Sequence, residues 1–233
     1  MVICIVLLSL GFVSLTIFII EKVKRYSFKA TMIKTVTSLL FIALGLYGVL
    51  SKTLSLMGFC FVLALVFGLL GDVFLDLKYD FIESENYFTN AGFIVFAIGH
   101  IFYIIGMYSE YYIQGNPLYI IIPIVLGVGL GLGNALLGKF MKLDYKNKKI
   151  LVFIYGSILF SMVLSAGSLW MLNGFNTTTL LMVFIGGILF ALSDLILSGT
   201  YFGIGKERPV DIILNSMTYY AAQFLIAFSL FFI

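Results

Sequence analysis

Hydrophobic residues run along this chain in eight long stretches that are separated by short polar breaks. A helix needs about 20 apolar residues to cross the hydrocarbon core of a bilayer, and each stretch is about that long. The first stretch lacks a basic leader and a small-residue cleavage site, so we expect it to be retained as a helix. The pattern predicts transmembrane helices over 1–20, 31–50, 55–77, 88–109, 118–138, 150–171, 178–201 and 211–233.

Composition excludes a water-soluble fold. Hydrophobic residues make up 62% of the 233 residues and charged residues only 11%, whereas an ordinary soluble domain has roughly 25% charged residues. We therefore expect an all-α integral membrane protein in which residues 1–233 form one domain, a bundle of about eight helices with no nucleic-acid partner. Cys4 and Cys60 lie in apolar stretches without metal-type spacing, so neither a disulfide framework nor a Cys-based zinc site is indicated.

The basic residues predict how the bundle is oriented. Cytoplasmic loops of membrane proteins carry an excess of Lys and Arg. In this chain Lys and Arg concentrate around the breaks after the first, third, fifth and seventh stretches. These breaks all lie on one side of the membrane, while those on the other side hold only Lys52. We predict that these breaks are cytoplasmic and that both termini lie outside the cell membrane. The residues are Lys22, Lys24, Arg25, Lys29, Lys78, Lys139, Lys142, Lys146, Lys148, Lys149, Lys206 and Arg208.

A short internal sequence similarity links the third and seventh stretches. Residues 71–75 read Gly-Asp-Val-Phe-Leu and residues 193–197 read Ser-Asp-Leu-Ile-Leu. The two segments are four helices apart and so run in the same direction. That spacing suits a parallel repeat of two four-helix halves.

Polar groups inside the spans carry the candidate chemistry. A charge near the bilayer centre costs at least about 2.5–3.5 kcal/mol, so such residues are rarely present without a role. Helix direction and a rise of about 1.5 Å per residue place Lys34, Asp72 and Asp194 at a similar depth near the cytoplasmic side, with His100 deeper. We expect a cavity there that opens toward the cytoplasmic leaflet. The candidate residues are Lys34, Asp72, Asp76, His100 and Asp194, supported by Tyr103, Tyr155, Ser193, Asn215, Tyr219, Tyr220 and Gln223.

Each charged candidate also has a purely structural interpretation. Asp72 and Asp194 could bond a neighbouring helix or pair with Lys34, but two acids and one amine leave one acid uncompensated, which favours function. Asp76 lies one turn after Asp72 on the same face and is either part of a site or a solvated helix end. Lys34 either extends to the interface or serves as a charge partner. His100 is interpreted as a hydrogen-bonded packing residue, because the chain has no second histidine.

Alternating glycines at 127, 129, 131 and 133 superficially suggest a nucleotide-binding loop. They follow no strand and open no soluble helix, which argues against that interpretation. Close helix packing at Gly127 with Gly131, and at Gly129 with Gly133, explains them better.

Four segments together resemble successive signatures of the YhhN-type lysoplasmalogenase family. A lysine in the second helix, here Lys34, fits the same pattern, although Thr35 follows it where we expect proline. The similarity covers helices 2 to 4 and 6 to 8 in the family's order. The segments are GLLGDVFL at 68–75, GFIVFAIGHIFY at 92–103, FALSD at 190–194 and YYAAQ at 219–223.

The resemblance implies hydrolysis of the vinyl ether bond of a lysophospholipid substrate, a lysoplasmalogen, to a fatty aldehyde and a glycerophospho-headgroup alcohol. The family's proposed catalytic aspartates map onto Asp72 and Asp194. The chemistry suits two carboxylates, because one can protonate the alkene while the other activates water, as in glycosidases. Which aspartate has which role stays open at this point.

Two other classes of function share some of these features. A proton- or ion-coupled transporter also buries carboxylates, but such proteins often carry them near broken helices, and only Pro123 of the three prolines lies within a span. A metal-dependent membrane hydrolase of the ceramidase type usually draws on several histidines. With His100 alone, we expect neither a metal nor a cofactor, and we expect the partners to be the substrate and membrane lipids.

Overall fold

The structure, a computed structural model, describes residues 2–24, 27–52, 54–112, 116–138, 142–203 and 208–233. These residues form eight long helices, each long and apolar enough to cross a membrane. The prediction of an all-α, multi-pass membrane protein is therefore confirmed. The helices are α1 Val2–Lys24, α2 Phe28–Leu50, α3 Leu56–Asp80, α4 Glu85–Tyr111, α5 Leu118–Leu137, α6 Lys149–Leu172, α7 Thr178–Phe202 and α8 Pro209–Ser229, with short 3-10 turns at Ile82–Ser84, Lys146–Lys148 and Leu230–Phe232.

Several helices extend further than the apolar stretches that predict them. α1 continues to Lys24 and α3 to Asp80, so Lys22 and Lys78 lie inside helices and not in the breaks that the sequence pattern gave them. Hydropathy marks where apolar residues stop, whereas a helix continues as long as polar side chains can find partners. The extra helical turn places Lys22 and Lys78 nearer to the polar interior of the bundle.

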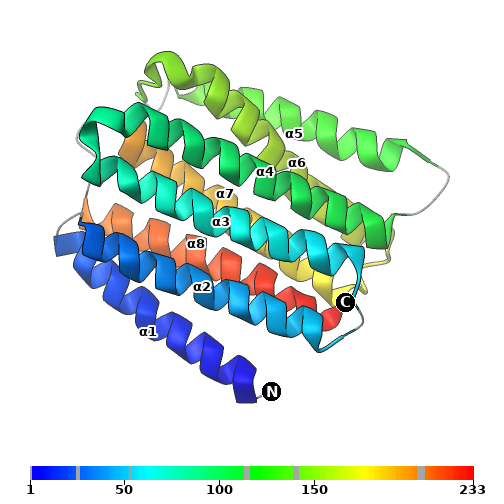
Figure 1. Ribbon diagram of the computed structural model, residues 1–233. Coiled ribbons are helices and arrows are strands. Elements are labelled where there is room, and N and C mark those ends of the chain that lie inside the picture. Colours follow the sequence, from blue (N-terminus) through cyan, green and yellow to red (C-terminus); the bar gives the residue numbers. More distant parts are fainter. Residues whose placement is uncertain (1, 25–26, 53, 113–115, 139–141, 204–207) are drawn as a thin grey trace.

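Successive helices run up and down, and the two chain ends lie at the same end of the bundle (Figure 1). Helix α1 packs on α2 and α8 at one edge, while α5 lies at the opposite edge and packs on α6. Helices α3 and α4 form the most extensive helix pair, and α7 pairs with α8. The acids of α3 and α7 therefore lie inside the bundle, between these pairs.

The starts of the helices follow ordinary capping rules. Ser27 Oγ accepts a hydrogen bond from the Ala30 amide at 3.4 Å, and Ser55 Oγ accepts one from the Gly58 amide at 3.0 Å. Pro209 occupies the first turn of α8, where its missing N–H costs nothing. Polar breaks thus end one helix and begin the next.

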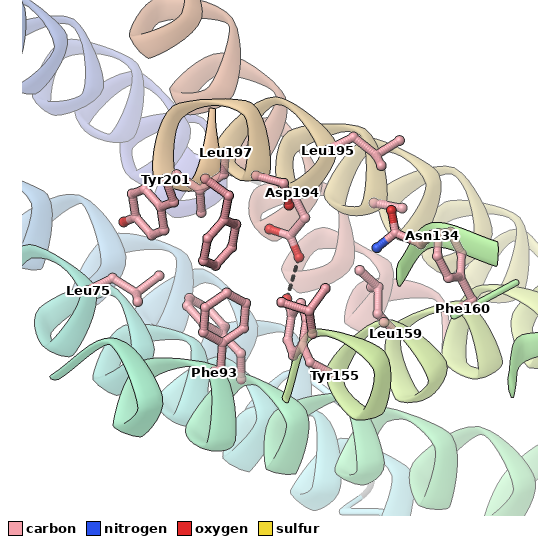
Figure 2. A pocket seen from close by; sticks show the side chains of 16 residues that line it. Leu75, Phe93, Asn134, Tyr155, Leu159, Phe160, Asp194, Leu195, Leu197 and Tyr201 are labelled. Carbon is pink, nitrogen blue, oxygen red and sulfur yellow. Dashed lines mark hydrogen bonds between the residues drawn. The ribbon is translucent and has the colours of Figure 1, made fainter. Parts of the chain in front are cut away.

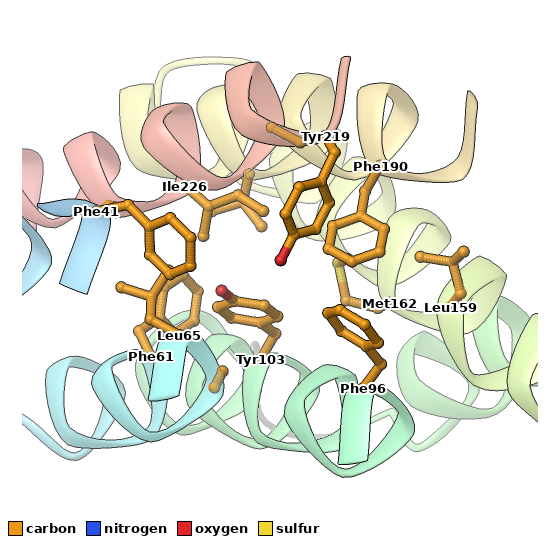
Figure 3. Packing of buried hydrophobic residues seen from close by; sticks show 14 of the residues in the cluster. Phe41, Phe61, Leu65, Phe96, Tyr103, Leu159, Met162, Phe190, Tyr219 and Ile226 are labelled. Atoms are coloured by element: carbon orange, nitrogen blue, oxygen red, sulfur yellow. The ribbon is translucent and has the colours of Figure 1, made fainter. Parts of the chain in front are cut away.

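Buried aromatic rings fill the centre of the bundle (Figure 3). The ring of Phe190 on α7 lies edge-on to Phe96 on α4, with centroids 5.8 Å apart, and to Tyr219 on α8 at 5.3 Å. Phe61 and Tyr103 make a similar contact at 4.9 Å. Edge-to-face pairs of this kind are favoured by the ring quadrupole. They fix the ring of Tyr219 and so the direction of its hydroxyl.

Two of the four alternating glycines explain how α5 packs. A Cβ at Gly127 would lie 2.3 Å from Ser161 Oγ, and one at Gly131 would lie 2.4 Å from Ser157 Oγ, so the backbones of α5 and α6 touch there. Gly129 and Gly133 have nothing within 4 Å of an added Cβ. Packing at the first pair is confirmed, and packing at the second is wrong because residues two apart on a helix point to opposite sides.

Candidate functional site

Asp72 is held by donors from two neighbouring helices. Its Oδ2 accepts hydrogen bonds from the hydroxyls of Ser38 on α2, at 2.6 Å, and Tyr219 on α8, at 2.8 Å. Its Oδ1 lies 3.2 Å from Lys34 Nζ, and the aspartate is only 2% exposed. An ionised carboxylate can only accept hydrogen bonds, and all three contacts come from donors. The surroundings therefore suit the ionised form of Asp72.

Lys34 lies between two carboxylates. Its Nζ is 3.2 Å from Asp72 Oδ1 and 3.3 Å from Asp76 Oδ1. Lys34 is therefore a buried charge partner, and the alternative that it extends to the interface is wrong. Asp76 is 4% exposed, so its interpretation as a solvated helix end is also wrong, because α3 continues for another turn to Asp80.

A second lysine completes this cluster and was missed in the sequence. Lys22 Nζ on α1 lies 2.9 Å from Asp76 Oδ1 and 5.1 Å from the centroid of the Phe18 ring. A signal for it exists, since Cys4, Gly11 and Phe18 form the buried face of α1 and Lys22 follows Phe18 by four residues, on the same face. Ser38 was missed too, although it follows Lys34 by four residues.

Asp194 on α7 has a different environment. Its Oδ2 accepts a hydrogen bond from the hydroxyl of Tyr155 on α6. Among the described residues, no Lys or Arg nitrogen forms an ion pair with it. Lys22 and Lys34 together balance Asp72 and Asp76, so Asp194 is the acid without a cation.

Asn215 and Ser193 join α8 to α7 beside Asp194. Asn215 Nδ2 donates to the Ser193 carbonyl and to Ser193 Oγ, both at 2.9 Å, and Ser193 Oγ donates to the Asn215 carbonyl at 3.3 Å. Both side chains are used by these contacts. They position the helix that carries Asp194.

Tyr103 and Gln223 extend the hydrogen bonds behind Asp72. The hydroxyl of Tyr103 donates to Gln223 Oε1 at 3.3 Å, and Gln223 Nε2 donates to Tyr219 Oη at 3.1 Å. Since Tyr219 in turn donates to Asp72, three helices, α4, α8 and α3, contribute to one chain of polar contacts. Of the predicted supporting residues, Tyr103, Tyr219 and Gln223 are thus brought together behind Asp72.

His100 stays apart from these contacts. It is 1% exposed, and its ring packs edge-on to Phe190 with centroids 4.7 Å apart. Neither ring nitrogen has a hydrogen-bond partner among the residues that the structure describes. His100 is a packing residue as predicted, but the expected hydrogen bond is not found in this part of the chain.

Two pockets meet at Asp194, and Figure 2 shows the side chains that line the more apolar of the two. The polar chamber, as we call it, is lined by Lys22, Lys34, Asp72, Ser193, Asp194, Asn215, Ser216 and Tyr219, together with mainly aromatic and aliphatic neighbours. The apolar chamber is lined mainly by Leu, Phe, Val and Ala side chains of α4, α6 and α7. Leu75, Phe96, Asp194, Leu197 and Tyr201 line both. Asp194 is the acid at their junction, and Asp72 belongs to the polar chamber alone.

The polar chamber continues toward the end of the bundle that carries the basic breaks. A smaller adjoining pocket shares Lys22 and Asn215 with it and extends to Thr200 and Asp211. The predicted cavity thus lies at the end where α1 and α7 finish. That this end faces the cytoplasm stays a prediction.

A family model, the YhhN family, matches residues 29–230 of the chain. The chain belongs to the YhhN family. No curated protein and no solved structure matches it. The four segments that resemble YhhN signatures lie in α3, α4, α7 and α8, and their side chains supply Asp72, Tyr103, Asp194, Tyr219 and Gln223 to the site. Membership of the YhhN family is consistent with a membrane hydrolase.

The site of this YhhN-family protein contains side chains for acid–base chemistry. Among the described residues, no group of three or more His, Cys, Asp or Glu side chains is placed to hold a metal ion. Asp72 and Asp76 both contact Lys34, and among the described residues no third His, Cys, Asp or Glu side chain joins these two carboxylates. Asp72, Asp194 and Tyr155 are among the groups that line the chambers and can exchange protons with a molecule there.

Proposed function

We propose that this protein hydrolyses the vinyl ether bond of lysoplasmalogens, releasing a fatty aldehyde and a glycerophospho-headgroup alcohol. The observation that carries the proposal is the position of Asp194 at the junction of an apolar and a polar chamber that also contains Asp72. A vinyl ether joins a hydrocarbon chain to a polar headgroup. A substrate lying across the junction therefore brings its reactive bond to Asp194.

Asp194 is the proton donor in this mechanism. It has no cation beside it among the described residues, and its Oδ1 makes no hydrogen bond there, while Oδ2 is held by Tyr155. The carboxyl O–H bond breaks as its proton joins the outer alkene carbon. The π electrons form that C–H bond, and the ether oxygen shares its lone pair with the inner carbon to give an oxocarbenium ion. Such protonation is general acid catalysis.

Asp72 is the base that activates water. Its carboxylate takes a proton from water while the water oxygen bonds to the oxocarbenium carbon, giving a hemiacetal. The hemiacetal hydroxyl then loses its proton, the bond to the glycerol oxygen breaks, and that oxygen takes up a proton. Aldehyde and alcohol result. Lys34 keeps a positive charge beside Asp72, which supports the carboxylate form needed for this step.

The continuity of the acid-bearing helices favours hydrolysis over ion-coupled transport. Transporters with midplane sites often carry them on helices broken within the membrane. Here α3 runs unbroken over Leu56–Asp80 and α7 over Thr178–Phe202. Pro123 lies in α5, at the edge of the bundle and away from Asp72.

The decisive experiment measures aldehyde release by purified protein in detergent micelles. The substrate is a lysoplasmalogen, and the controls are a saturated alkyl-ether lysophospholipid and a diacyl phospholipid. We expect aldehyde from the vinyl ether lipid alone, because a saturated ether has no alkene to protonate. Folded protein that releases no aldehyde from any lysoplasmalogen would show that the proposal is wrong.

Variants of the two acids test the assigned chemistry. Asp72→Asn and Asp194→Asn keep size but can neither donate a carboxyl proton nor act as a base. Each should lower turnover at least about 10²-fold, the lower end of the usual range for general acid–base catalysis. Asp80→Asn is the matched control, because Asp80 lies exposed on α3 near the helix end. Equal thermal unfolding must accompany the comparison.

A further inference from the structure

The apolar chamber has the shape of a slot between helices. Its walls come from α6 and α7, with Leu159 on one side and Leu197 on the other, and with Phe93 of α4 at its floor (Figure 2). The slot encloses about 570 Å³, its open side included. Most of its lining is apolar, and Asp194 and Tyr155 are among the few polar side chains that reach it.

One end of this slot is closed. The ring of Phe202, at the end of α7, lies 5.0 Å from the ring of Tyr145 and 6.4 Å from that of Phe93, measured between centroids. The amide of Asp144 donates to the Phe202 carbonyl at 2.8 Å, which fastens the connection before α6 to this point. A chain in the slot cannot leave toward this end of the bundle without displacing these rings.

The other side of the slot is open to the surroundings of the bundle. Asn134 of α5, Phe160 of α6 and Leu195 of α7 lie together there, away from Tyr201 (Figure 2). Leu195 is 37% exposed, on a helix that is long and apolar enough to span a membrane. The opening thus faces the hydrocarbon of the bilayer and not water.

We propose that the apolar chamber is the binding site of the substrate's alkenyl chain, which enters sideways from the bilayer between α5, α6 and α7. The vinyl ether then lies at Asp194 and the glycerophospho end in the polar chamber. This inference rests on the proposed hydrolase function and adds a direction to it. The substrate moves from the bilayer into the slot with its headgroup toward Asp72 and the lysines.

The fit of the alkenyl chain in the slot, and not the hydrophobic effect, decides which chain lengths bind. Lipid tails are as apolar as leucine, so moving a chain from the bilayer into the protein gains little from leaving water. The slot instead supplies close contact along the alkenyl chain of the lipid. A larger side chain in the wall of the slot would disturb this contact. Chain-length preference is therefore the property to measure.

Ala191→Leu is the variant that narrows the slot. Ala191 lines the apolar chamber one turn before Asp194 and is 8% exposed. The matched control is Ala221→Leu, because Ala221 is exposed on α8 and lines neither chamber. The substrates are lysoplasmalogens of one headgroup with short, medium and long alkenyl chains, all presented in the same micelles.

We expect Ala191→Leu to lower kcat/KM for the long chain relative to the short chain by at least about fivefold, since inserting extra methylenes into a packed site costs about 1 kcal/mol or more. Ala221→Leu should keep the chain-length profile of the unmodified protein. An unchanged profile in folded Ala191→Leu overturns the inference while leaving hydrolysis itself intact. Absence of aldehyde from the unmodified protein overturns the proposed function instead.

A crosslinking experiment is independent of activity and of how Ala191→Leu folds. The probe is a saturated alkyl-ether lysophospholipid with a diazirine at the chain end and an alkyne for detection, applied to the unmodified protein. We expect labelled peptides from α6 and α7 around Phe160 and Leu195, and loss of this label with excess unlabelled lysolipid but not with diacyl lipid. Labelling elsewhere only, or labelling that no competitor reduces, overturns the inference.

Discussion

The ammonium group of Lys22, near the end of α1, lies 2.9 Å from Asp76 Oδ1 on α3. Asp76 also contacts Lys34, which in turn contacts Asp72, so four charges from three helices balance one another. Removing one partner from a buried pair leaves an uncompensated charge, which is far more costly than removing both. Lys22 thereby ties the first helix to the candidate site, which the ring of Phe18 on the same helix also lines.

Lys22→Met and Asp76→Asn should each destabilise the protein by roughly 3–5 kcal/mol, and the double variant by clearly less than the sum, because it leaves neither charge alone. Equilibrium unfolding in mixed detergent micelles measures the coupling as a double-mutant cycle. Lys24→Met is the control, since Lys24 is 67% exposed in its pair with Glu21 and should change stability by less than about 1 kcal/mol. Strict additivity of the two single variants would show that the Lys22–Asp76 contact contributes nothing.

The spans and the depth of the main acids could be predicted from sequence because both follow from length along a helix. Lys22 could not be placed in this way, since a long side chain at a helix end can point to water or inward depending on what packs beside it. Ser38 carries no charge, so its position one turn after Lys34 gains meaning only when α2 packs against α3 and the hydroxyl reaches Asp72. Asp76 depends on the same tertiary contact, because the lysines that bury it come from other helices.

The parallel repeat stays a prediction, as does the assignment of residues 1–233 to one domain. The helix neighbours are those that such a repeat would have: α2 packs on α3 and α8, while α6 packs on α7 and α4. In each half the hydroxyl donor precedes the acid by one helix, with Ser38 before Asp72 and Tyr155 before Asp194. The helix contacts and the similarity between residues 71–75 and 193–197 thus agree with two four-helix halves.

Tyr155→Phe should lower turnover by about tenfold or more with little change in fold. The variant removes the only described donor to Asp194, which would stabilise the carboxylate that remains once Asp194 has given up its proton, and hydrogen bonds to charged groups contribute about 1.5–3 kcal/mol. Tyr108→Phe is the matched control, because the hydroxyl of Tyr108 contacts Ser165 and the Tyr119 carbonyl, away from both chambers. Aldehyde release and thermal unfolding are measured for both. Equal turnover of the two variants would remove Tyr155 from the mechanism.

Single cysteines introduced at exposed positions should report the orientation in the membrane. Cysteines at Glu83 and Asn147 should react with an impermeant thiol reagent only after the membrane is opened, and cysteines at Lys52 and Asn176 without opening it. The native Cys4 and Cys60 are buried and give a low background. The reverse labelling pattern would place both termini inside, and the polar chamber would then open to the outside.

Hydrolysis should survive prolonged treatment with a chelator. Asp72, Asp76 and Asp194 contact lysines or hydroxyl groups. Among the described residues, no group of three or more His, Cys, Asp or Glu side chains is placed to hold a metal ion. Aldehyde release is measured after dialysis against chelator and again after adding back divalent ions. Activity that disappears and returns with one ion would favour a metal-dependent hydrolase over carboxylate catalysis.

The double variant Asp72→Asn, Asp194→Asn should lose less turnover than the product of the two single losses. In the proposed mechanism protonation by Asp194 creates the cation that water attacks, so a base at Asp72 has nothing to assist once the first step is lost. Groups that act as a unit in this way are non-additive, whereas two independent contributions would multiply.

The measurement compares all three variants with the unmodified protein on one lysoplasmalogen, at equal yield and equal thermal unfolding. If each single change costs at least about 10²-fold, independence requires the double variant to lose at least about 10⁴-fold. A loss near that of the worse single variant supports successive use of the two acids in one reaction. A fully multiplied loss would mean that Asp72 and Asp194 act separately, and the division into one proton donor and one base would then be wrong.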